Sequence, residues 1–145
     1  MSLRWIAAAA VLTCTVPVAA QAQTAAEVVQ RHVDSMKTGD LNKVMDDYAA
    51  DTVVVTPQGL VSDQKPAVGP GVFSGQAEAR RVFTVLTSPG SLPGIKAMET
   101  RIEPVGTDGA LLHWVQNKGK PNQVAGKDVF IVRNNKIAYQ TILVD

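Results

Sequence analysis

The chain contains little cysteine, few aromatic residues and no excess of charge of either sign. Its 145 residues include one Cys and two His, 5% of them are aromatic, and 14 Lys and Arg stand against 13 Asp and Glu. Charge-driven binding to nucleic acids or anionic membranes needs a basic surface, so neither is predicted as a partner. The hydrophobic share of 46% and the charged share of 19% are typical of one folded globular domain and exclude a disordered chain.

The first 22 residues predict a secretory signal peptide. Arg4 precedes an apolar run over residues 5–16, and small residues end the segment at Ala22. The run is shorter than the roughly 20 residues that a membrane-spanning helix needs. We therefore expect cleavage after Ala22 and a periplasmic or secreted domain, residues 23–145, with no membrane attachment after processing.

Helical periodicity predicts three helices in this domain. The first covers residues 24–38 and ends at Gly39, the second covers 41–51, and the third covers 75–88. Each has an apolar face. The residues that we expect these faces to bury are Val29, His32, Val33 and Met36 in the first helix, Leu41, Val44, Met45 and Tyr48 in the second, and Ala79, Val82, Phe83 and Leu86 in the third.

The remaining segments predict strands. β-Branched residues over 52–56 form a short strand before Pro57, and an irregular segment over 58–74 follows it. Alternating periodicity then predicts an antiparallel meander of four strands, over 95–106, 108–118, 122–133 and 136–145. The predicted fold class is α+β, with three N-terminal helices packed on a curved antiparallel sheet and a pocket between the two layers.

One predicted strand is apolar on both of its faces. Val129 and Ile131 lie on the face opposite Asp128 and Phe130, so a second cover is needed beyond the helices. A second copy of the chain would supply that cover, and we therefore expect a homodimer.

Three strings of residues resemble one family over nearly the whole mature chain. They are VVQRHVDSMKTGDLNKVMDDYAADTVVVTPQG, GQAEARRVF and KDVFIVRNNKIAYQ. These strings resemble the nuclear-transport-factor-2-like (NTF2-like) superfamily, which contains SnoaL-like proteins and ketosteroid isomerase. The resemblance implies a cystatin-like cone with a central pocket, in a fold that hosts many unrelated functions.

The resemblance assigns roles to three positions. His32 stands where ketosteroid isomerase has a Tyr that donates a hydrogen bond, and it retains the ability to donate one. Asp128, two residues before Phe130, matches the Asp that stabilises the oxyanion. Thr56 stands where that enzyme has its Asp base, and a hydroxyl cannot replace a carboxylate in that role. Ketosteroid isomerisation itself is therefore not expected.

Turn geometry brings the other histidine into the prediction. A two-residue turn at Gly119-Lys120 would place His113 opposite Gly126, on the same face as Asp128. A slip of one residue would turn His113 to the other face. The predicted catalytic constellation is Asp128, His32 and His113, because histidine beside a carboxylate can move protons near neutral pH.

Five further residues are candidates for contact with the substrate. Tyr139 and Gln140 alternate sides on the last strand, so one of them should face the pocket, and the sequence leaves open which. The predicted substrate-binding residues are Tyr48, Thr56, Phe83, Phe130 and Gln140.

No cofactor or metal is predicted. The only cysteine, Cys14, lies in the leader, so the mature chain has no thiolate, and no closely spaced ligand pair, phosphate loop or nucleophile elbow occurs. The predicted function is cofactor-independent acid-base chemistry, of the isomerase, lyase or cyclase type, on a small apolar molecule. The alternative is a non-catalytic periplasmic module for ligand binding or dimerisation.

Overall fold

The computed structural model describes residues 23–61 and 71–145. The helices in this part of the chain are α1 (Ala25–Thr38), α2 (Leu41–Asp46), α3 (Gln76–Leu86) and α4 (Leu92–Lys96). The strands are β1 (Tyr48–Thr56), β2 (Gly71–Ser74), β3 (Glu99–Val105), β4 (Gly109–Gln116), β5 (Val124–Arg133) and β6 (Lys136–Val144). The predicted signal peptide, and residues 62–70 of the segment predicted to be irregular, lie outside the described residues.

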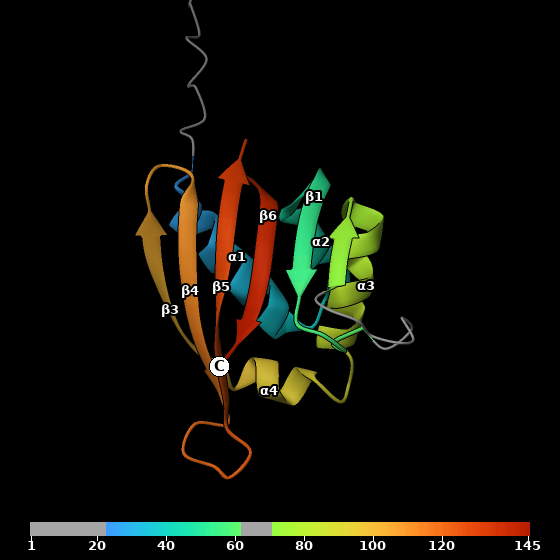
Figure 1. Ribbon diagram of the computed structural model, residues 1–145, viewed down its shortest axis with the longest axis vertical. Coiled ribbons are helices and arrows are strands. Elements are labelled where there is room, and N and C mark those ends of the chain that lie inside the picture. The colour runs from blue at the N-terminus through green and yellow to red at the C-terminus, as the bar shows by residue number, and fades with distance from the viewer. Residues whose placement is uncertain (1–22, 62–70) are drawn as a thin grey trace, which may run out of the picture.

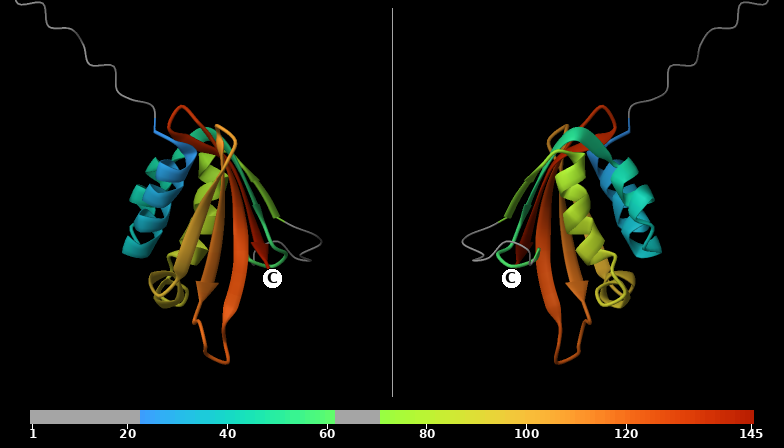
Figure 2. Two further views of the ribbon diagram at one scale, coloured as in Figure 1. Left: turned by 90° about the vertical axis from the view of Figure 1, so that its left-hand side faces the viewer. Right: turned by 90° about the vertical axis from the view of Figure 1, so that its right-hand side faces the viewer.

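The strands form one curved sheet, and the helices cover one of its faces. The strand order is β2-β1-β6-β5-β4-β3, with β1 and β6 parallel and the other neighbours antiparallel. Side views show the helices on the concave side of the sheet, with the opposite face uncovered (Figures 1 and 2). This arrangement confirms the predicted α+β class and the meander from β3 to β6.

Local sequence signals determine where the two N-terminal helices begin and where α1 ends. Thr24 and Glu27 form a reciprocal capping box at the start of α1, and Gly39 ends that helix with a φ of 76°. Asp40 then accepts the first backbone N–H groups of α2. Val29, His32, Val33 and Met36 are all buried, as the apolar stripe predicts.

The core lies between the helices and the concave face of the sheet. Along β5, every second residue is buried, so Asp128, Phe130 and Val132 point toward the helices. The packing of α1, α3 and the central strands therefore fixes the surroundings of each inward side chain, including Asp128.

Three element predictions are wrong. Residues 71–74 form β2, antiparallel to β1, where an irregular segment was predicted. The second helix ends at Asp46, and Tyr48 begins β1 instead of continuing the helix. Ile95 and Lys96, which were predicted to begin a strand, form the last two residues of α4 (Leu92–Lys96). The physical reason is Pro93, which occupies the first turn of α4, where a missing N–H costs nothing.

The predicted register between β4 and β5 is also wrong, by one residue. Residues 117–123 form a longer connection than the predicted two-residue turn, so Leu112 lies opposite Asp128 and His113 lies opposite Lys127. Because the side-chain period of a strand is two, the slip moves His113 to the convex face of the sheet. It turns Trp114 toward the helices.

The convex face of the sheet carries exposed apolar side chains. Val129 is 36% exposed and Ile131 is 37% exposed, which agrees with the predicted apolar character of both faces of β5. Val72, Val105 and Leu143 are also large exposed apolar residues, whereas the exposed Val124 and Val144 line the cavity on the other face. Among the described residues, none of the helices has the length and apolar character needed to cross a membrane.

Candidate functional site

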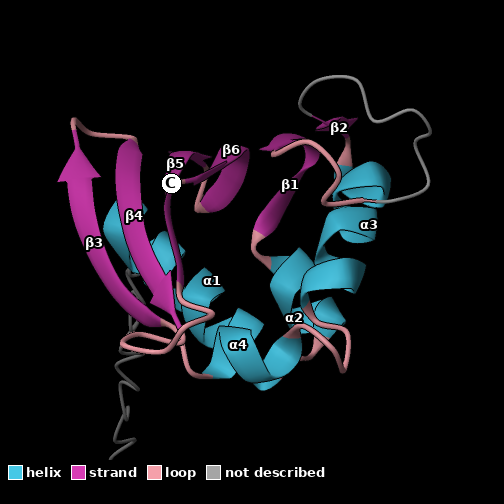
Figure 3. Ribbon diagram, turned by 60° about the horizontal axis from the view of Figure 1, so that its bottom comes forward, coloured by secondary structure: helices cyan, strands magenta, loops and turns pink. Residues whose placement is uncertain are grey.

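A cavity of about 510 Å³ lies between the helices and the concave face of the sheet. Figure 3 looks into the end where α4 lies across from the curved sheet. The wall is mostly apolar. Its polar side chains fall into a well-buried inner group, His32, Asp128 and Gln140, and a less buried outer group, Ser91, Gln116, Asn117 and Asn122.

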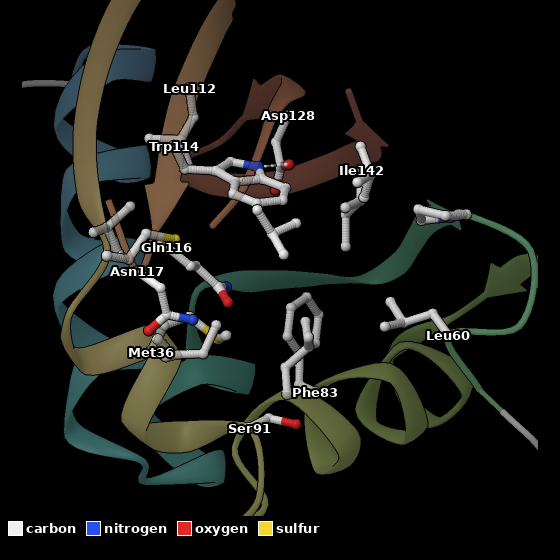
Figure 4. A pocket seen from close by; sticks show the side chains of 18 of the residues that line it. Met36, Leu60, Phe83, Ser91, Leu112, Trp114, Gln116, Asn117, Asp128 and Ile142 are labelled. Carbon is white, nitrogen blue, oxygen red and sulfur yellow. Dashed lines mark hydrogen bonds between the residues drawn. The ribbon is translucent and has the colours of Figure 1, made fainter. Parts of the chain in front are cut away.

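Among the described residues, Asp128 is the only acidic residue of the wall, and protein N–H groups approach both of its carboxylate oxygens. The indole Nε1 of Trp114 donates to Oδ1 at 2.8 Å, and the amide Nε2 of Gln140 donates to Oδ2 at 2.7 Å. Figure 4 shows Trp114 and Asp128 side by side at one end of the cavity. Burial raises the pKa of Asp128 to about 6, although the two hydrogen bonds lower it in part. Asp128 is therefore mainly ionised at pH 7.

A chain of hydrogen bonds continues behind Asp128. The hydroxyl of Tyr48 donates to Oε1 of Gln140, and Nε2 of His32 lies 3.3 Å from the same hydroxyl. Since the Tyr48 proton points to Gln140, Nε2 of His32 must carry the proton that joins the two rings. All donors in this series of hydrogen bonds then point toward the Asp128 carboxylate. This common direction stabilises the negative charge of the carboxylate.

His32 and Tyr48 are both neutral at neutral pH. Burial, together with the nearby charge of Arg31, lowers the pKa of His32 to about 3. Burial also raises the pKa of Tyr48 well above its usual value, with Asp128 and Asp47 acting in the same direction. Asp128 is consequently the only charged member of the inner group.

A glycine makes room for the Trp114 side chain. Gly126 lies opposite Trp114 on β5, and a Cβ at this position would come within 2.4 Å of the indole Cζ2 and within 2.1 Å of the Leu143 carbonyl oxygen. Only glycine allows the indole to lie flat over the strand and reach Asp128.

The structure places the predicted site residues in three locations. His32, Phe83, Asp128 and Gln140 line the cavity, which also decides between Tyr139 and Gln140. Tyr48, Thr56 and Phe130 are buried nearby but are not part of the cavity wall. His113 lies on the convex face, with Nε2 3.5 Å from Oε2 of Glu103, so it does not reach Asp128.

Sequence reasoning did not predict the contribution of Trp114 to the site. The available signal was Gly126, because a glycine inside a strand often marks the close approach of a large side chain. The sequence analysis also did not predict that Gln116 and Asn117 would contribute polar side chains to the outer end of the cavity. Within residues 23–61 and 71–145, no three His, Cys, Asp or Glu side chains gather as a metal site.

Comparison with known proteins adds structural relatives only. No family model matches the sequence, and no curated protein matches it. An NTF2-like protein of unknown function from Burkholderia xenovorans has 17% identity and a TM-score of 0.61, over 83% of this chain and 82% of that chain. A protein of unknown function with a cystatin-like fold from Methylobium petroleophilum has 16% identity and a TM-score of 0.56, over 83% and 74%.

A third solved structure contains a ligand. TerC, co-crystallised with polyporic acid, has 16% identity and a TM-score of 0.61, over 83% of this chain and 91% of that chain. At these identities the similarity concerns the fold and not the activity. The described chain has the NTF2-like fold of the superfamily that its sequence resembles.

Proposed function

We propose that the cavity binds a small, mostly apolar molecule and that Asp128 acts as a general base on it. The observation that carries this proposal is the Asp128 carboxylate, which is the one carboxylate that residues 23–61 and 71–145 contribute to the wall of a largely apolar cavity, and whose pKa is about 6. A base with a pKa near the working pH is both ionised and able to hold a proton. The similarity to TerC, which was crystallised with polyporic acid, supports ligand binding by this fold.

The proposed reaction is a proton transfer that needs no cofactor. An oxygen of Asp128 takes a proton from a carbon next to a carbonyl group, and the C–H electron pair moves into an enolate. Asp128 then returns the proton to another carbon, which gives isomerisation, or the enolate expels a leaving group, which gives elimination. Trp114 and Gln140 hold the carboxylate in place.

His32 has an orienting role in this proposal. Its pKa of about 3 keeps the ring neutral, and Gln140 separates it from Asp128. An amide cannot relay a proton as imidazole does, so the chain from His32 polarises Gln140 without transferring a proton.

Hydrogen–deuterium exchange at carbon tests the base without knowledge of the natural substrate. The protein is incubated in D₂O with 2-tetralone, an apolar ketone with acidic C–H groups, and exchange is followed by NMR. We expect catalysed exchange with the wild type, and a rate about 10²–10⁴-fold lower with Asp128→Asn. An equal rate with the two proteins would show that Asp128 is not the base.

One observation favours a second candidate function, ligand binding without chemistry. Both oxygens of Asp128 already accept a protein N–H, so the carboxylate is well satisfied without a substrate. In that case, 2-tetralone would bind, as measured by calorimetry, without any catalysed exchange.

Export and dimerisation complete the proposal. The composition of residues 1–22 supports cleavage after Ala22, which intact-mass measurement of the protein from a periplasmic extract tests directly. The exposed apolar residues of β5 support pairing of two sheets through their convex faces. Sedimentation of Ile131→Lys tests this pairing, because a charge in the interface should convert a dimer into a monomer.

A further inference from the structure

The outer end of the cavity contains an amide side chain without a hydrogen-bond partner among the described residues. Gln116 is the last residue of β4 and follows Leu112 and Trp114 on the inward face of that strand. Its side chain reaches into the cavity, as Figure 4 shows. Within the described part of the chain, its Nε2 and Oε1 atoms make no hydrogen bond, so two donors and one acceptor remain available to a ligand.

A glycine on α4 allows this position of the amide. Gly94 and Gln116 both line the cavity and lie next to each other. A Cβ added to Gly94 would lie 2.9 Å from Oε1 of Gln116. Gly94 has a helical backbone conformation, in which alanine is the better residue by about 1 kcal/mol. The glycine therefore has a local cost, and its benefit is space for the amide.

Gln116 and Asp128 lie at separate points along the cavity. Asp128 is opposite Leu112, and Gln116 lies four residues further along β4, which corresponds to about 13 Å at roughly 3.4 Å per residue. The wall between them is apolar and includes Met36, Phe83 and Ile142. A ligand that fills this space has an apolar body between two polar ends.

We propose that Gln116 determines specificity by binding a hydroxyl or carbonyl group at the far end of an elongated ligand, whose acidic group lies against Asp128. This inference rests on the proposed function. The amide accepts from a hydroxyl through Oε1 and donates to a carbonyl through Nε2. Because Asp128 is negatively charged and Gln116 is neutral, the ligand class is a neutral molecule with an apolar ring body and an oxygen at each end.

Two matched pairs of phenols test the inference by calorimetry. The first pair is 4-phenylphenol and 4,4′-dihydroxybiphenyl, and the second is 2-naphthol and 2,6-dihydroxynaphthalene. Each diol adds only a far-end hydroxyl. For at least one pair, we expect the wild type to bind the diol about 5-fold more tightly than the mono-ol, which corresponds to one hydrogen bond of about 1 kcal/mol.

Variants assign this preference to Gln116. Gln116→Leu should bind the diol and the mono-ol equally, and Gly94→Ala should reduce the preference because its methyl group displaces the amide. Gln30→Leu makes the same change on the exposed surface of α1 and should keep the full preference. The ratio of the two affinities within each variant corrects for any general loss of stability.

The outcomes separate this inference from the proposed function. If the mono-ols bind, and Asp128→Asn weakens their binding, but neither diol is preferred, the role of Gln116 is wrong while the cavity proposal stands. The same conclusion follows if Gln116→Leu keeps the preference. If none of the phenols binds, the cavity does not accept such ligands, and both proposals are wrong.

Discussion

Each face of the sheet places a carboxylate beside a ring nitrogen. On the concave face, Asp128 accepts from Trp114 at 2.8 Å, and on the convex face Glu103 lies 3.5 Å from His113. Burial raises the pKa of Asp128 to about 6, whereas the hydrogen bond from Arg101 lowers the pKa of Glu103, which is exposed to solvent. The concave face thus holds a buried carboxylate with a raised pKa, and the convex face holds an exposed carboxylate with a lowered pKa.

The difference shows that position relative to the two layers, more than residue type, decides the chemistry. Histidine is the usual residue for proton transfer at neutral pH, and sequence reasoning favoured His113 for that reason. In the proposed function Asp128 takes that place, because burial raises the pKa of its carboxyl group to about 6. Variants of the two faces test this comparison most directly.

The largest effect is expected from removal of the two carboxylates in turn. Asp128→Asn should lower the exchange rate of 2-tetralone about 10²–10⁴-fold, and Glu103→Gln should leave it unchanged. In the wild type, the rate should rise with pH through about 6 and then become constant, because the base acts only when ionised. A rate that falls as the pH rises through this range would identify an acid instead of a base.

The next effect concerns stability, and it has opposite signs for two neighbouring buried groups. The folded pKa of His32 is lowered from 6.5 to about 3, so its neutral form loses stability as the pH falls below 6.5. The folded pKa of Asp128 is raised from 3.8 to about 6, so stability is greatest below 3.8 and is lost as the pH rises through 6. Between pH 4 and 6, the two contributions should nearly cancel.

Single variants should expose each contribution. From pH 6 to pH 4, Asp128→Asn should lose about 2 kcal/mol relative to the wild type, and His32→Gln should gain roughly 2 to 3 kcal/mol relative to it. Urea unfolding at the two pH values measures both changes, and the surface carboxylates contribute equally to all three proteins. Parallel pH curves for the three proteins would show that neither group is perturbed by burial.

A smaller effect is expected from Gly126→Ala. The added methyl group would lie within 2.4 Å of the Trp114 indole and within 2.1 Å of a backbone carbonyl, so we expect a loss of about 2 kcal/mol in the free energy of unfolding. Displacement of the indole should also lower the exchange rate. Gly90→Ala is the matched control for stability, because its methyl group meets no other atom within 4 Å.

The parts of the fold that depend on local signals could be predicted from the sequence. Thr24 and Gly39 mark the ends of α1, and the alternating pattern identifies the meander. The burial of Asp128 also followed from its apolar neighbours. The register of β4 against β5 could not be predicted, because it depends on the conformation of the seven-residue connection after Gln116 and not on a residue pattern.

This register error had a specific consequence for the candidate site. Leu111 and Leu112 are both apolar, so the pattern of β4 does not show which of its faces is buried. With the predicted pairing, His113 pointed to Asp128. In the structure Trp114 occupies that place. A pocket between the helices and the sheet was predicted, but the contribution of α4 to its wall was not, because the sequence analysis predicted no helix over residues 92–96.

The smallest effect, and the sharpest test of the comparison, comes from the two neighbouring rings of β4. His113→Gln removes a ring from the convex face of the sheet. Its contact with the exposed Glu103 is long, at 3.5 Å, and exposed polar contacts contribute only about 0–1 kcal/mol, so stability and the exchange profile should both stay nearly constant. Trp114→Phe keeps the apolar packing but removes the Nε1–H donor. Since that hydrogen bond lowers the pKa of Asp128, the midpoint of the exchange profile should move to higher pH. A shift caused by His113→Gln but not by Trp114→Phe would place the working pair on the convex face and overturn the assignment of Asp128.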